Sequence, residues 1–247
     1  MKITVPTKIR WRKTITPDVL GSYSKKKRKR ISQILEDETL HIQTSFEKLT
    51  EDHLRWFSPM YAETISQKEN GVFHDVKETT LDNDKKTYYI LTVTENSKPI
   101  GGTIFSIRKE AIGIAYRIYP NDWPMHTLAA NPSLFSDYII TEYALSLGKE
   151  FISHGMDRNL YGVNSAIGLA TFKMSVGYEP FIPFKPKYEE VDTANIDDSA
   201  LIFHKPDGDD MKIKRATLLH KEDQVSSYKQ LLTYLEAADI STTVENV

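Results

Sequence analysis

Apolar and polar positions along the chain follow two different periods, which predict strands and helices in alternation. Residues 40–46 alternate apolar and polar side chains, as a half-buried strand does. Residues 50–68 carry apolar side chains at helical spacing, and Asn70 with Gly71 is expected to end that helix. Three more segments of strand type follow at short intervals, at 88–95, 100–108 and 112–120. Because the turns between them have hairpin lengths, we expect an antiparallel meander.

The second half of the chain continues the alternation. Residues 120–132 contain three prolines and are expected to form a loop. The apolar stripe that follows predicts a long helix, which begins near Asn131 or Ser133 and ends near His154. The remaining expected elements are a short strand at 160–164, a helix at 168–176, strands at 199–205 and 211–218, and a closing helix at 221–237.

This order of elements predicts an α+β fold, with a mixed and mostly antiparallel sheet flanked by helices. We expect a basic N-terminal extension at residues 1–38 and a single domain at 39–247. The core of that domain is expected at 39–184, and the further strands and helix at 185–247 complete it.

Composition narrows the class of protein. The 247 residues are 40% hydrophobic and carry a net charge of −2, as in ordinary globular proteins. The sequence has neither a long apolar run nor an apolar leader, so we expect no membrane span and a cytoplasmic location. The chain has no cysteine, which excludes disulfides, thiolate metal sites and cysteine nucleophiles.

Basic residues are concentrated in the run Lys25–Arg30. The sequence 1–40 holds eleven basic and four acidic residues, whereas 186–247 holds seven basic and thirteen acidic. Ile31, Ile34 and Leu35 follow the run at helical spacing. The run is therefore either the solvated start of a helix or a surface that contacts the phosphates of nucleic acid or anionic lipid head groups.

Several site types lack support in the sequence. It contains no glycine-rich phosphate-binding motif and no nucleophile-elbow motif. The histidines are not paired at metal-ligand spacing, so no metal is expected. Asp207, Gly208 and Asp209 are residue types that a hairpin turn requires, and we interpret them as a turn rather than a cation site.

Residues 155–184 read GMDRNLYGVNSAIGLATFKMSVGYEPFIPF. The strand end at Asn164 and Ser165, followed by a short helix that reaches Gly177 and Tyr178, resembles the closing motif of GCN5-related N-acetyltransferases. The order of elements over 39–184 is similar to that fold as well. The resemblance implies acyl transfer to an amine.

Two departures point to one branch of that superfamily. Lys173 stands where the classical enzymes have a tyrosine, and 120–132 lacks the glycines of the coenzyme A loop. The run Gly168-Leu169-Ala170-Thr171-Phe172-Lys173, ending at Gly177, resembles the FemAB-type peptidyltransferases, which use aminoacyl-tRNA. The resemblance implies acyl-CoA or aminoacyl-tRNA as donor and a small-molecule or peptide amine as acceptor. A loop without glycine predicts weak coenzyme A binding.

Lys173 and Asn164 are the candidate catalytic residues. Acyl transfer passes through an oxyanion, which a lysine in a water-poor site stabilises. Because Lys173 lies one step off the apolar face of its expected helix, its side chain points either into a cleft or into solvent. Asn164, with Ser165, either positions the acyl group or caps the following helix.

The remaining candidates are substrate-binding residues. Tyr116 and Arg117 are expected near the end of a meander strand, where arginine suits a phosphate or carboxylate, although one of the two faces the core. Tyr178 is a candidate for substrate binding, and either it or Glu142 for the general base. The competing interpretation is a catalytically inactive binding module, whose basic run docks to nucleic acid or another anionic partner.

Overall fold

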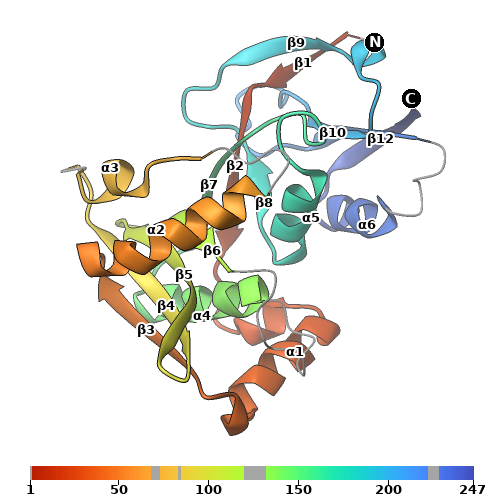
Figure 1. The fold of residues 1–247 in the computed structure, drawn as a ribbon. Helices are drawn as coiled ribbons and strands as arrows, with labels where there is room; N and C mark the ends of the chain where they lie inside the picture. Colours follow the sequence, from red (N-terminus) through yellow and green to blue (C-terminus); the bar gives the residue numbers. More distant parts are fainter. Residues whose placement is uncertain (1, 68–72, 83–84, 120–131, 222–227) are drawn as a thin grey trace. The chain divides into compact units, whose positions relative to one another are not determined.

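The computed structural model describes residues 2–67, 73–82, 85–119, 132–221 and 228–247 (Figure 1). The chain divides into two compact units. The central unit is Thr14–Ser153, and the terminal unit combines Met1–Lys13 with His154–Val247. The names refer to the middle of the sequence and to its two ends. The fold is α+β with a mostly antiparallel sheet flanked by helices, as the sequence predicts.

The central unit contains the predicted meander. Its strands follow the order β3, β4, β5 and β6, and each pair is antiparallel. The bounds are β3 Ile42–Lys48, β4 Tyr88–Glu95, β5 Lys98–Ile107 and β6 Ala111–Ile118. These strands agree with the expected segments to within two residues at each end.

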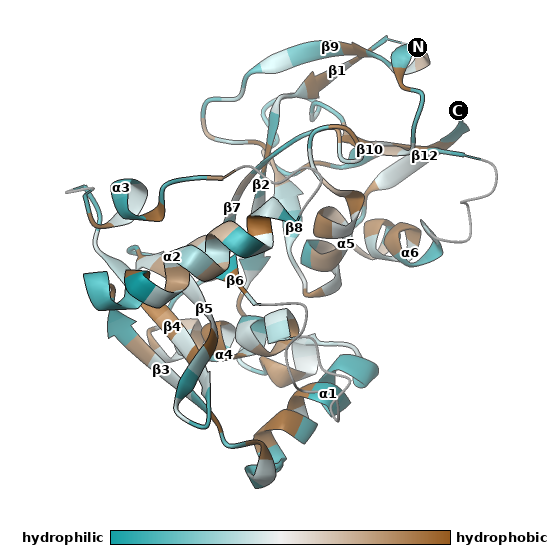
Figure 2. Ribbon diagram, in the orientation of Figure 1, coloured by the Kyte–Doolittle hydropathy of each residue, from teal (hydrophilic) through white to brown (hydrophobic). Residues whose placement is uncertain are grey.

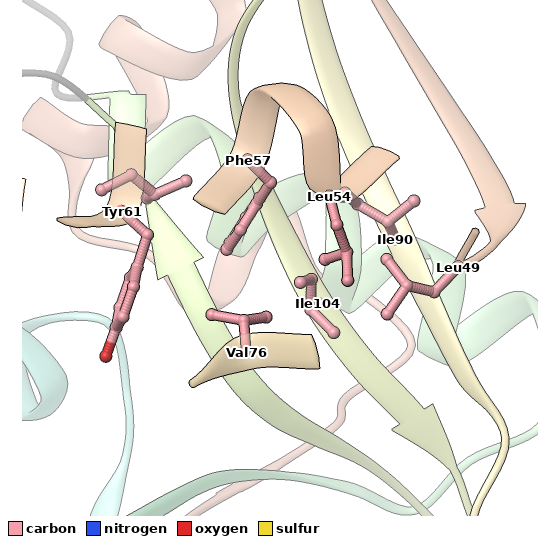
Figure 3. Close-up of a cluster of buried hydrophobic side chains, with 8 residues drawn as sticks. Leu49, Leu54, Phe57, Tyr61, Val76, Ile90 and Ile104 are labelled. Carbon is pink, nitrogen blue, oxygen red and sulfur yellow. The ribbon is translucent and has the colours of Figure 1, made fainter. Parts of the chain in front are cut away.

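Helices of the central unit pack on this sheet. Helix α2 (Glu51–Ser66) contacts β5 and β6, and α4 (Pro132–Ser146) contacts β6. The apolar side of α2 and the short α3 (Val76–Thr80) enclose a buried cluster with the strands (Figure 3). Phe57 and Ile90, both fully buried, lie in it; each contributes about 1.5–3 kcal/mol through burial.

Helix α1 (Lys25–Glu36) carries the basic run and packs against α4. Ile31 and Ile34 are buried, whereas Lys25 and Lys26 are exposed. Figure 2 shows hydrophilic and hydrophobic residues along α1. The prediction of a helix whose basic side chains are solvated is confirmed, and contact with an anionic partner stays a prediction.

The terminal unit contains strands of three sheets. Strand β1 (Lys2–Pro6) pairs with β9 (Tyr188–Asp192), and β2 (Lys8–Thr14) pairs with β8 (Glu179–Phe181), both antiparallel. The third sheet has the order β10 (Ala200–Phe203), β11 (Arg215–His220) and β12 (Ser241–Asn246). Residues 2–14, expected in a basic extension, are thus paired as strands.

Helices of the terminal unit are α5 (Ile167–Ser175) and α6 (Lys229–Ala237), which contact each other. The turn predicted at Asp207 to Asp209 is confirmed, with Gly208 at φ 60° and Asp207 paired to Arg215 at 2.7 Å. Single 3-10 turns lie at Leu20–Ser22, Glu38–Leu40 and Thr193–Asn195.

Two expectations about the middle of the chain are wrong. The long helix ends at Ser146 because Gly148 adopts φ 65°. Strand β7 (Phe151–Arg158) then begins, where the sequence pattern predicted the end of the helix. The expected strand at 160–164 is a turn, with Leu160 at φ 62° and Gly162 at φ 102°.

Some expectations concern residues outside those that the structure describes. They are the helix stop at Asn70 and Gly71, the loop at 120–131 with the cap at Asn131, and the start of the closing helix at 222–227. Within the described ranges, no helix has the length and apolarity needed to cross a membrane.

Candidate functional site

Lys173 lies on the buried side of α5. Ala170 and Met174, which are neighbours at helical spacing, are buried with it, and Lys173 itself is only 1% exposed. The interpretation of Lys173 as a solvated surface residue is therefore wrong. A buried ammonium requires compensation, because removing it from water costs several kcal/mol.

The compensation comes from the end of β7. The Lys173 Nζ lies 2.6 Å from Asp157 Oδ2 and 2.8 Å from Asp157 Oδ1, and it also donates to the His154 carbonyl oxygen at 3.3 Å. The side chain of Asp157 is 12% exposed. Lys173 and Asp157 thus form a largely buried ion pair whose accessible part is the carboxylate.

Two aromatic side chains complete the environment of this carboxylate. The indole Nε1 of Trp11 donates to Asp157 Oδ2 at 2.8 Å, and the Tyr161 hydroxyl donates to the same oxygen at 2.8 Å. Lys173 Nζ lies 5.5 Å from the centroid of the Trp11 ring. We refer to Trp11, Asp157, Tyr161 and Lys173 as the Asp157 cluster.

Tyr161 acts in the cluster as a hydrogen-bond donor. Burial, followed by the charge of Asp157, raises the pKa of Tyr161 well above its ordinary value of about 10. The phenol therefore stays protonated at neutral pH. Trp11 and Tyr161 are both 0% exposed, so the cluster excludes water from that side of the carboxylate.

Local sequence explains why these side chains converge. In β2, Ile9, Trp11 and Lys13 are buried at alternate positions, so Trp11 points inward. Tyr161 is held by two backbone hydrogen bonds with Leu201, at 2.8 and 2.9 Å.

The turn that carries Tyr161 is anchored by Asn159, which is 1% exposed. Its Nδ2 donates to the carbonyl oxygens of Pro6 and Phe203, and its Oδ1 accepts from the amides of Leu160 and Phe203. The amide side chain thereby has both donors and both acceptor sites used. Asn159 fixes the position of the turn rather than facing a ligand.

Asn164 and Ser165 belong to the same turn. The Asn164 Nδ2 donates to the Asn159 carbonyl oxygen at 3.1 Å, and the Ser165 hydroxyl donates to the Arg158 carbonyl oxygen at 3.3 Å. Neither caps α5, whose N-cap is Ala166 without a side-chain hydrogen bond, so the capping interpretation is wrong. Their roles toward a substrate stay predictions.

Tyr178 is 1% exposed and follows Gly177, whose φ of 92° ends the turn after α5. Its ring meets His154 edge-on at 5.4 Å between centroids, and Lys13 Nζ lies 6.0 Å from its centroid. Lys13, His154, Lys173 and Tyr178 all belong to the terminal unit. The role of Tyr178 in substrate binding or as the general base stays a prediction.

Tyr116 and Arg117 belong to the central unit. Burial raises the pKa of Tyr116, whose ring meets that of Tyr61 at 5.4 Å. Arg117, only 7% exposed, lies 3.5 Å from the fully buried Asp137. The Tyr23 hydroxyl donates to the other carboxylate oxygen of Asp137 at 2.8 Å. Arg117 is thus part of a buried polar network.

Glu142, the other candidate for the general base, lies in α4 of the central unit. Its charge contributes to a raised pKa of Tyr138, after burial of that phenol. No hydrogen bond or ion pair between residues with a described placement joins Glu142 to Tyr116 or Arg117, the other candidates of its unit. Its role stays a prediction.

Among the residues with a described placement, no three acidic or histidine side chains gather closely enough to hold a metal ion. The sequence analysis missed Trp11, Asp157 and Tyr161. Alternation in residues 8–14 was the one available signal for Trp11.

Comparison with known proteins places the fold. No protein-family model and no curated protein matches the sequence. The crystal structure of FemX superposes with a TM-score of 0.53 at 12% identity, over 70% of this chain and 59% of FemX. The chain thus spans about three fifths of the FemX chain.

Two further structures are less similar. The L-PGS structure from Bacillus licheniformis gives a TM-score of 0.47 at 14% identity, over 76% of this chain and 61% of that one. A GCN5-related N-acetyltransferase-like protein from Streptococcus suis gives 0.32 at 13% identity, over 75% and 61%. The fold of the chain is similar to that of FemX, in line with the resemblance of the sequence motif to FemAB-type enzymes.

Proposed function

We propose that this protein is an acyltransferase that moves an acyl or aminoacyl group from an activated donor to an amine. The observation that carries the proposal is the buried Lys173–Asp157 pair, at the position where the sequence resembles FemAB-type enzymes. The similarity of the fold to FemX supports it. The chemistry needs a preorganised cation in a water-poor site, and Lys173 is such a cation.

In the proposed reaction, the amine attacks the carbonyl carbon of the donor. The carbonyl becomes an oxyanion; the carbonyl then forms again as the bond to the ester oxygen or thioester sulfur breaks, and the leaving oxygen or sulfur takes up the proton that the amine loses. Lys173 stabilises the oxyanion by exchanging its hydrogen bond with the His154 carbonyl oxygen, which is 3.3 Å long, for one with the substrate. Asp157 keeps the ammonium in place throughout.

The other candidates take supporting roles in this proposal. Asn164 positions the acyl group, with Ser165 and Tyr178 as substrate-binding residues. Tyr116 and Arg117 belong to the central unit, and their substrate-binding role stays a prediction that is independent of Lys173. The donor is either an acyl-CoA or an aminoacyl-tRNA, and the acceptor is a small-molecule or peptide amine.

An aminoacyl-tRNA donor is supported by the exposed basic residues of α1. Lys25–Arg30 would neutralise phosphates of the tRNA, with an affinity that falls steeply as the salt concentration rises. Residues 120–132 contain no glycine, which disfavours close backbone contact with the pyrophosphate of coenzyme A.

Lys173→Met tests the proposed mechanism over a panel of acyl-CoA and aminoacyl-tRNA donors. Losing one oxyanion donor costs about 3–4 kcal/mol, so we expect kcat to fall by at least about a hundredfold. Lys185→Met, at an exposed position of the same unit, is the matched control and should leave kcat unchanged. Near-ultraviolet circular dichroism verifies the fold of both variants. An unchanged kcat in folded Lys173→Met would remove Lys173 from the mechanism.

The exposed basic surface of α1 also supports a second function, a catalytically inactive module that docks to nucleic acid. Thermal stabilisation by acetyl-coenzyme A, aminoacyl-tRNA and bulk RNA separates the two. An enzyme should be stabilised selectively by its donor. A docking module should be stabilised by any polyanion, and the effect should vanish at high salt.

A further inference from the structure

A concave site lies in the central unit, where β4 begins and β5 ends. Its volume is about 530 Å³, within the range of small-molecule pockets. The lining residues are Lys85, Lys86, Thr87, Tyr89, Ser106, Ile107 and Arg108. We call it the β4–β5 pocket.

The β4–β5 pocket is strongly positive. Three of its lining residues are cationic and, among those whose placement is described, none is acidic. Lys86 and Arg108 form no ion pair with any residue of the described ranges. Unlike Arg117, which is paired with the buried Asp137, these charges remain available to a ligand.

The position of Arg108 depends on a glycine. A Cβ atom at Gly113 would lie 2.9 Å from Nη2 of Arg108 and 3.2 Å from its Cζ. The guanidinium therefore lies against the β6 backbone, in space that a side chain at 113 would take. The Arg108 amide also donates to the Ala111 carbonyl oxygen at 2.8 Å, which closes the β5–β6 turn.

Ser106 contributes a hydroxyl from the strand itself. The residue is 4% exposed, and it is paired with Tyr88 of β4 and Gly113 of β6 in the sheet. No residue within the described ranges forms a hydrogen bond with its hydroxyl. A nearly buried hydroxyl of this kind favours a polar ligand in the pocket that it lines.

We propose that the β4–β5 pocket binds a small molecule that carries a phosphate group. The guanidinium of Arg108 matches two phosphate oxygens, Lys86 adds charge, and the Ser106 hydroxyl donates to a third oxygen. The lining also includes Tyr89 and Ile107. The proposal does not depend on acyl transfer, because the pocket adjoins the start of β6, whereas Tyr116 and Arg117 lie near its other end.

Calorimetric titration of the full chain with inorganic pyrophosphate at physiological salt tests this proposal. We expect saturable binding with one site per chain. Arg108→Gln and Lys86→Gln should each weaken it at least tenfold, and Ser106→Ala several-fold. Lys98→Gln removes the same charge as Lys86→Gln from an exposed position of β5 outside the pocket, and it should leave the affinity unchanged.

Three results would overturn the assignment. The first is a titration without saturation. The second is an equal loss of affinity in Lys98→Gln and Lys86→Gln, which would indicate general attraction to a positive surface. The third is binding of citrate as tight as that of pyrophosphate, which would contradict a phosphate site. Circular dichroism of each variant confirms that a lost affinity does not reflect a lost fold.

Discussion

The Asp157 carboxylate accepts hydrogen bonds from three side chains, on α5, on β2 and in the turn after β7. At the scale of single residues, the sequence indicated one residue of the Asp157 cluster. Lys173 was identified from its place in a motif, and its burial follows from the spacing of Ala170 and Met174. Asp157 was missed because the pattern predicted a helix as far as His154, so no strand end was expected beside it. The pairing of Asp157 with Lys173 depends on tertiary structure, which the local periodicity of the sequence does not report.

Asp157→Asn tests how strongly the ion pair holds the terminal unit. Removing one partner of a buried pair leaves an uncompensated charge, and we expect the free energy of unfolding to fall by about 3 kcal/mol. Urea denaturation measures it. Asp207→Asn breaks the exposed pair with Arg215 and should change stability little. An equal loss in the free energy of unfolding in the two variants would show that the buried pair contributes no more to stability than the exposed pair.

Tyr161 gives the stability of the protein a pH dependence. Its pKa is raised in the folded state, so above about pH 10 the unfolded chain loses a proton that the folded chain retains. Stability should be complete below pH 10 and fall as the pH rises beyond it. In Tyr161→Phe this decline should be shallower, as seen in urea denaturation between pH 9 and pH 11. An identical slope in the variant would assign the decline to other groups.

At the scale of elements, hairpins were predicted well and distant pairings were not. The β4, β5 and β6 meander is joined by short turns, so its signals lie close together in the sequence. Strands β1 and β8 were missed. The partner of β1 begins at Tyr188, and β8 has only three residues, too few to show a period.

Gly148 ends α4 through its backbone conformation, and this predicts opposite effects for two glycine substitutions. A Cβ atom would meet nothing within 4 Å at Gly148 or at Gly168. Gly148→Ala forces φ 65° on an alanine and should cost about 1–2 kcal/mol. Gly168→Ala, in α5, should stabilise by about 0.5–1 kcal/mol. Thermal denaturation checks both, and the same sign in both variants would contradict the backbone explanation.

At the scale of the whole molecule, the sequence indicated the fold class and the GNAT-like order of elements, but it did not indicate the division of the chain. Residues 1–38 were expected to precede a single domain at 39–247. In the structure, Met1–Lys13 belongs to one compact unit with His154–Val247. Composition and charge report local segments, and they carry no signal for two segments that are far apart in sequence and share one core.

Trp11→Ala tests whether the two units are stabilised separately. Loss of this fully buried side chain should cost about 3–5 kcal/mol, and amide hydrogen exchange should accelerate mainly in His154–Val247. Trp56→Ala, in α2 against the core of the central unit, should accelerate exchange mainly within Thr14–Ser153. Equal acceleration across the chain in both variants would show that the units unfold as one.

The pairing of early and late segments sets an order for folding during synthesis. Trp11 and Tyr161 are 150 positions apart, so Trp11 waits roughly 10–30 s, at about 5–20 residues per second, before its partner leaves the ribosome. Synthesis of the central unit is complete at Ser153, before synthesis of the terminal unit is complete at Val247. Until then, the apolar side chains on the buried face of β2 have no core to pack against. Chaperones that bind exposed apolar side chains therefore have their longest access to the nascent chain at this stage.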